Sequence, residues 1–145
     1  MLGTVTALLL SFSPDATPSP ELSVKAVVEL QLEGLRRNPT LPNDAGIRLA
    51  FRFASPANKA QTGPVERFIP MVKSPTYAPL LGFDDASVAV ISDAPEGAHL
   101  VVEVRRGDTA NMYMWVLSRQ SNGAWMTDAV VPIEPDEAPP GTLSA

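Results

Sequence analysis

The chain changes its hydrophobic period part-way along, from a helical repeat in the first half to strict alternation in the last third. Apolar residues three and four positions apart predict a first helix over residues 20–37. Its buried stripe has one polar member, Gln31. Ser19-Pro20-Glu21 is typical of a helix start, because it combines a capping serine, a proline and an acid. Asn38-Pro39 predicts the end of that helix.

Two shorter helical segments follow before the period changes. The first covers residues 45–51, and Pro56 ends it because the residue before a proline avoids helical angles. The second begins at Thr62-Gly63-Pro64, and Pro70 is expected to shorten or kink it.

Alternation then predicts four strands at residues 86–92, 98–106, 110–120 and 124–133. Helices followed by a meander of strands indicate an α+β fold with a mainly antiparallel sheet. We expect one domain over residues 20–133, a poorly ordered leader and linker at residues 1–19, and a loose tail at residues 134–145. An extra strand over the apolar run at residues 5–12 is the alternative to a leader.

The last two turns set the strand register. If Gly107-Asp108 and Asn122-Gly123 each form a two-residue hairpin, Val102 faces Tyr113 and Trp125 faces Gln120. The more apolar face, expected to receive the helices, then comprises Leu100, Val102, Val104, Tyr113, Trp115, Leu117, Arg119, Met126, Asp128 and Val130. The opposite face carries His99, Val101, Glu103, Arg105, Met112, Met114, Val116, Ser118, Gln120, Trp125, Thr127 and Ala129. A one-residue bulge would exchange these assignments.

The second face combines charged residues with large apolar ones. Met114, Val116 and Trp125 are its candidate contact residues, and a sheet face of this kind often meets another subunit. We therefore expect a homodimer that forms through the sheet.

Composition narrows the choice of partners. The chain has 145 residues, 45% hydrophobic and 19% charged, with a net charge of -5. This acidity argues against nucleic acids and anionic membranes as partners. Cysteine is absent, which excludes disulfides and cysteine-ligated metal sites. The apolar run at residues 5–12 is too short to span a bilayer, so we expect a soluble protein, cytoplasmic or, if residues 1–19 are a leader, organellar or exported.

Candidate chemistry lies on the more apolar face. Arg119 and Asp128 would be diagonal neighbours there, with Arg119 as an anchor for an anion or carbonyl and Asp128 as a general acid or base. Tyr113 would donate a hydrogen bond beside them. A structural ion pair, or simple exposure near the turn, explains the same two charges without catalysis. The single histidine, His99, falls on the other face, and we expect neither a metal site nor a cofactor.

Several ordered motifs resemble a known family. They are Ala50-Phe51-Arg52-Phe53-Ala54-Ser55-Pro56, Phe68 with Met71-Val72, Tyr77-Ala78-Pro79-Leu80, Trp115-Val116-Leu117-Ser118-Arg119-Gln120, and Gly123-x-Trp125. Together, from about residue 19 to residue 133, they resemble domain-of-unknown-function family 4864. The resemblance implies a nuclear transport factor 2-like cone, in which a curved sheet wraps a long helix.

The family has no assigned activity, so no catalytic residue carries over from it. We expect a non-enzymatic module that binds a small apolar ligand in the cone, mediates protein association, or does both. The residues expected to contact such a ligand are Gln31, Phe53, Tyr77, Tyr113, Trp115 and Arg119. A polar residue such as Gln31 in a buried helical stripe more often satisfies a nearby backbone group than contacts a ligand. The alternative function is a lyase, isomerase or hydrolase that acts on a small molecule with Asp128 as acid or base, and this fold class supports both kinds of function. A third option is a purely structural scaffold, whose filled cone would contain no cavity.

Overall fold

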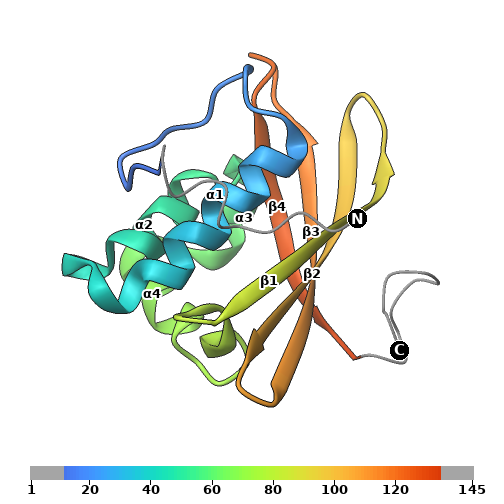
Figure 1. Cartoon of the computed structure of the whole chain (residues 1–145). Helices are drawn as coiled ribbons and strands as arrows, with labels where there is room; N and C mark the ends of the chain where they lie inside the picture. The colour runs from blue at the N-terminus through green and yellow to red at the C-terminus, as the bar shows by residue number, and fades with distance from the viewer. Residues whose placement is uncertain (1–11, 135–145) are drawn as a thin grey trace.

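A computed structural model describes residues 12–134, which form helices packed on one side of a twisted antiparallel sheet (Figure 1). The α-helices are α1 (Val24–Arg37), α2 (Ala45–Arg52), α3 (Pro56–Thr62) and α4 (Val65–Val72). Short 3-10 turns occur at η2 (Asn38–Thr40), η3 (Pro42–Asp44) and η4 (Ala78–Leu80). The strands β1 (Asp85–Asp93), β2 (Gly97–Arg106), β3 (Thr109–Arg119) and β4 (Trp125–Ile133) lie in sequence order. This confirms the predicted α+β class.

The first helix begins later than predicted. Ser23 is its N-cap, and the Ser23 hydroxyl accepts a hydrogen bond from the amide of Ala26 at 3.1 Å. Ser19 and Pro20 instead belong to a turn that is closed by a bond from the Leu22 amide to the Ser19 carbonyl. The buried stripe of α1 contains Gln31, as the spacing predicts, together with a fully buried Glu33.

Arg36 and Arg37, in the last turn of α1, neutralise the buried Glu33 carboxylate. Two nitrogens of Arg36 donate to it at 3.0 and 2.6 Å, and Nε of Arg37 donates at 2.5 Å. A buried acid without such partners would be strongly destabilising, so this cluster has a structural role.

The third helix, α3, was not predicted. Its seven residues, Pro-Ala-Asn-Lys-Ala-Gln-Thr, contain no large apolar side chain, so the hydrophobic period gave no signal there. Its start nevertheless has a local signature: Ser55 caps the Asn58 amide at 3.2 Å and proline follows at the first helical position. The serine-proline pattern assigned to the first helix thus starts a helix at residue 55 and a turn at residue 19.

The register between β2 and β3 is the predicted one. Arg106 pairs with Thr109, Val102 with Tyr113 and Leu100 with Trp115. The Gly107-Asp108 turn therefore joins the strands as a two-residue hairpin, and Gly107 supplies the positive φ of 56° that such a turn requires.

The register between β3 and β4 differs from the prediction by one residue. Trp125 pairs with Arg119 rather than with Gln120. The loop has three residues instead of two, because the Gly123 amide bonds to the Gln120 carbonyl and Gly123 takes a positive φ of 91°. This shift moves Trp125 and Thr127 onto the face that meets the helices, where both are buried.

A bulge in β4 then restores the predicted alternation. Thr127 pairs with Leu117, Ala129 pairs with Val116, and Asp128 is the extra residue between them. Val130 consequently lies opposite Trp115 on the inner face, as predicted. The sequence-based face assignment was therefore wrong for Trp125, Met126 and Thr127, while Asp128, assigned to the inner face, occupies the bulge.

A short extended segment covers the edge of β4 next to the bulge. The Thr127 amide donates to the Phe53 carbonyl and the Ser55 amide donates to the Thr127 carbonyl, both at 2.8 Å. Ala54 thus forms a parallel bridge with Thr127. This segment satisfies backbone groups that an exposed edge would leave unpaired.

Residues 12–19, assigned from the sequence to a leader and linker, contact the helices. Arg52 donates to the carbonyls of Ala16 and Pro14 at 2.6 and 2.9 Å, and the Arg37 guanidinium lies 4.7 Å from the centre of the Phe12 ring. The rest of the predicted leader, residues 1–11, and most of the predicted tail, residues 135–145, lie outside the described residues. Within residues 12–134, no helix is long and apolar enough to cross a membrane.

Candidate functional site

A cavity of about 540 Å³ lies between the helices and the inner face of the sheet. Its walls come from α1, α2, α3, α4 and η4 on one side and from β3 and β4 on the other. Most of the lining is apolar and includes Leu35, Ala50, Phe68, Val72, Leu80 and Val130. A volume of this size is typical of a pocket for a small molecule.

Three buried polar side chains meet at the deep end of the cavity. Nε2 of Gln31 donates to Oγ1 of Thr127 at 2.8 Å, and the indole N–H of Trp115 donates to Oε1 of Gln31 at 3.4 Å. The exposed fraction is 2% for Gln31, 2% for Thr127 and 1% for Trp115. Gln31 therefore joins α1 to two strands through side chains, rather than satisfying a backbone group.

The rim of the cavity is polar where α3 closes it. Asn58, Gln61 and Thr62 belong to its lining, and Asn58 Nδ2 donates to the Thr127 carbonyl at 3.1 Å. None of the residues of α3 is buried. The helix is therefore held to the sheet near the cavity by its cap and by hydrogen bonds to β4, with little apolar packing.

Tyr77 and Tyr113 stack with ring centroids 6.1 Å apart, yet only Tyr77 lines the cavity. The Tyr77 hydroxyl donates to the Val130 carbonyl at 3.0 Å and the Tyr113 hydroxyl donates to the Thr76 carbonyl at 2.8 Å. Burial raises the pKa of Tyr77. Burial, with a smaller contribution from Tyr77, raises the pKa of Tyr113 to about 12, so Tyr113 is a neutral hydrogen-bond donor at physiological pH.

Arg119 and Asp128 do not form the predicted pair. The Asp128 carboxylate accepts a hydrogen bond from the Ser118 hydroxyl at 2.9 Å, and Ser118 is also bound by the Gln120 amide. Arg119 is exposed; its Nε donates to the Gly123 carbonyl at 3.3 Å, and its guanidinium lies 5.8 Å from the centre of the Trp125 ring. The physical reason is the shifted register, which places Trp125 beside Arg119 and Asp128 in the bulge.

Only some of the residues that were predicted to contact a ligand lie in the cavity wall. Gln31, Tyr77 and Trp115 line the cavity, and Asp128 contributes to its wall. Phe53 is fully buried in the core and stands outside the wall, as do Tyr113 and Arg119. The reasoning from sequence missed Thr127 and Asn58. Thr127 shares a face with Trp125 two residues earlier, so the signal that could have found it is the size and apolarity of Trp125, which favour the buried face for both residues.

The outer face of the sheet retains two of the three predicted interface residues. Met114 and Val116 lie there, half-buried, and the row Ala89, Val101, Met114 and Val131 crosses all four strands. Val131 is 45% exposed. Trp125 lies on the inner face instead and is only 8% exposed, so it is unavailable to a partner docked on the outer face.

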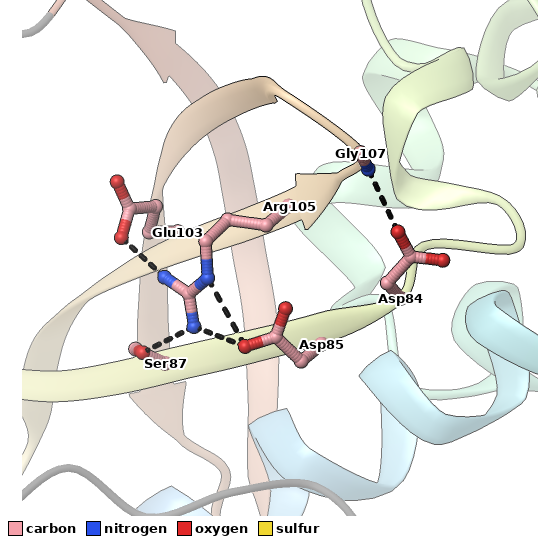
Figure 2. A network of polar contacts seen from close by, with 6 residues as sticks. All are labelled: Asp84, Asp85, Ser87, Glu103, Arg105 and Gly107. Atoms are coloured by element: carbon pink, nitrogen blue, oxygen red, sulfur yellow. Dashed lines mark hydrogen bonds and ion pairs between the residues drawn. The ribbon is translucent and has the colours of Figure 1, made fainter.

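One end of this outer face carries a charged network (Figure 2). Arg105 donates to Asp85 at 2.5 and 3.0 Å, to Glu103 at 2.5 Å and to Ser87 at 3.0 Å. The neighbouring Asp84 points away from Asp85 and accepts a bond from the Gly107 amide at 2.7 Å. Each acid therefore has a structural partner, and residues 12–134 contain no cluster of histidine and acidic side chains that could hold a metal ion.

Comparison with protein families shows which family the chain belongs to. A family model described as "Domain of unknown function (DUF4864)" matches residues 18–139. The chain belongs to the DUF4864 family. The match extends from before α1 to beyond β4, so it includes every element that lines the cavity, and it confirms the membership that the ordered motifs predicted. No curated protein and no solved structure matches the chain.

Proposed function

We propose that this DUF4864 protein is a non-enzymatic binding module that holds a small, neutral and mainly apolar molecule in the cavity between its helices and β4. The observation that carries the proposal is the combination of a volume of about 540 Å³ with apolar walls and one buried polar group of Gln31 and Thr127. Apolar walls supply affinity and a few fixed polar atoms supply orientation.

The charge of the wall supports a neutral ligand. Among the described residues that line the cavity, Asp128 alone is charged, and its carboxylate is engaged by Ser118. No cation in this lining is available to balance an anionic ligand, and burying an unpaired charge is costly.

We also propose that the fold is a variant of the nuclear transport factor 2-like cone. The support is the packing of the long helix α1 and the shorter helices against one face of the twisted sheet (Figure 1). The cavity lined by both layers is the second support. Association through the outer face remains a further proposal, supported by the apolar row that ends at the exposed Val131.

The alternative function, a lyase, isomerase or hydrolase with Asp128 as acid or base, has less support. It requires Asp128, Tyr113 and Arg119 to converge on one concavity, and only Asp128 belongs to the cavity wall. Tyr113 and Arg119 each bond to a backbone carbonyl elsewhere.

A matched pair of fluorescent probes tests the proposal. N-phenyl-1-naphthylamine is neutral, and 8-anilinonaphthalene-1-sulfonate is the same skeleton with an added sulfonate. We expect saturable binding of the neutral probe with one site per chain and much weaker binding of the sulfonate, because the wall lacks a free cation. Equal affinity for both probes, or binding of neither, would overturn the proposal.

A further inference from the structure

We infer that the deep end of the cavity selects ligands that carry a hydrogen-bond acceptor, such as a ketone or ester carbonyl, over ligands that carry only a donor. This inference rests on the proposed function and adds the chemical class of the ligand. It follows from the fixed directions of the hydrogen bonds among Trp115, Gln31 and Thr127.

Trp115 determines the orientation of the Gln31 amide. An indole nitrogen can donate a hydrogen bond and cannot accept one. The Gln31 atom that faces it at 3.4 Å must therefore be Oε1, because the NH₂ group in that place would set two donors against each other. The amide nitrogen then necessarily faces Thr127.

The orientation of the amide in turn determines the role of Thr127. Its Oγ1 accepts the bond from Gln31 Nε2 at 2.8 Å, so its own proton must point elsewhere. Among the described residues, no acceptor receives the Thr127 hydroxyl proton. The second hydrogen of Gln31 Nε2 is likewise without a protein acceptor there. Gln31 and Thr127, which carry these two spare donors, both line the mainly apolar cavity.

Spare donors in an apolar site favour a ligand with an acceptor. Such a ligand satisfies the Thr127 hydroxyl or the Gln31 amide. A donor-only ligand leaves both of these donors unpaired, and at this end of the cavity it meets only oxygens that already accept a bond, Oγ1 of Thr127 and Oε1 of Gln31. A carboxylate is also an acceptor, but the lining offers no cation to neutralise it. A neutral carbonyl compound with an apolar body meets both requirements.

Three tricyclic compounds of nearly the same shape test this inference by equilibrium dialysis against the full chain. Fluorenone carries only an acceptor, carbazole only a donor, and fluorene neither. We expect fluorenone to bind about fivefold to tenfold more tightly than fluorene, as one hydrogen bond would give, and carbazole to bind no more tightly than fluorene. Equal binding of all three, or a preference for carbazole, would overturn the inference.

Variants at Gln31 and Thr127 locate the effect. Thr127→Val combined with Gln31→Leu keeps a similar volume and removes both spare donors, so the preference for fluorenone over fluorene should disappear. Thr127→Ser keeps the hydroxyl and should retain the preference, as the matched control. If the double variant fails to fold, the ranking of the three compounds on the wild-type chain and on the serine variant still decides the matter.

The outcomes separate this inference from the proposed function. If N-phenyl-1-naphthylamine and all three tricyclic compounds fail to bind, the cavity is not a ligand site and both claims fail. If the probe and the compounds bind without preference for the acceptor, the binding function stands and the donor-directed selectivity is wrong.

Discussion

The carbonyl oxygen of Gly34 in α1 lies 1.9 Å from the position that a Cβ atom on Gly46 in α2 would occupy. The two helices therefore meet backbone to backbone, which is closer than any side chain permits. Asn38 supports the same crossing from the end of α1, because its Oδ1 accepts a bond from the Ile47 amide of α2 at 3.0 Å. The crossing positions Gln31 and Leu35 of α1 against Ala50 of α2 in the cavity wall.

Replacing Gly46 by alanine should destabilise the protein, by about 1–3 kcal/mol or more, because the added methyl meets fixed backbone. Helix propensity alone predicts the opposite sign, since alanine is favoured over glycine within helices. Urea unfolding measures the change. Gly97→Ala is the matched control, because a Cβ there meets only the Leu117 carbonyl at 3.7 Å, an ordinary contact. A Gly46→Ala variant as stable as Gly97→Ala would contradict the close crossing.

Tyr113 should make stability depend on pH in the alkaline range. The unfolded chain releases this phenol proton near pH 10, whereas the folded chain keeps it until about pH 12. The contribution is complete below the unfolded pKa and is lost as pH rises toward the folded one. Urea unfolding just below pH 10 and at about pH 11 should show a steeper loss for the wild type than for Tyr113→Phe. Identical slopes would show that burial does not perturb Tyr113.

We expect a homodimer that forms through the outer face of the sheet, and a single charge added to that face should disrupt it. Val131→Lys places a cation in the apolar row beside Met114 and should give a monomer by size-exclusion chromatography with light scattering. Val90→Lys is the matched control. Val90 is 46% exposed, close to the 45% of Val131, but it lies near the end of β1 and pairs with Leu100, whose side chain belongs to the inner face. A wild-type monomer, or equal loss of dimer in both variants, would contradict association through this face.

The fold class and most of the sheet could be predicted from sequence because each depends on local signals. Alternation and the Gly107 turn are enough to pair Val102 with Tyr113. The predicted β3–β4 register was wrong because an Asn-Gly pair is compatible with loops of two or three residues, and only the observed loop shows which is formed. The bulge at Asp128 is likewise a tertiary feature, stabilised by the segment around Ala54 that binds the edge of β4.

Only about half of the candidate site could be predicted from the sequence, again because the rest depends on features that no local signal sets. Gln31 and Trp115 were found because the helical stripe and the strand alternation place them inside. Thr127 depended on the uncertain register and was assigned to the wrong face. Asn58 lies on a helix without a hydrophobic period, so no sequence pattern indicated its place at the cavity rim.

The central claim is that the cavity itself binds the ligand, and one titration tests it most directly. Ala50 lines the cavity and is 7% exposed, so Ala50→Phe should fill the space, whereas Ala94→Phe adds the same ring on the exposed link between β1 and β2. Titration with N-phenyl-1-naphthylamine should show saturable binding to the wild type and to Ala94→Phe, and little or none to a folded Ala50→Phe. Undiminished binding to Ala50→Phe, or no saturable binding to the wild type, would contradict the claim.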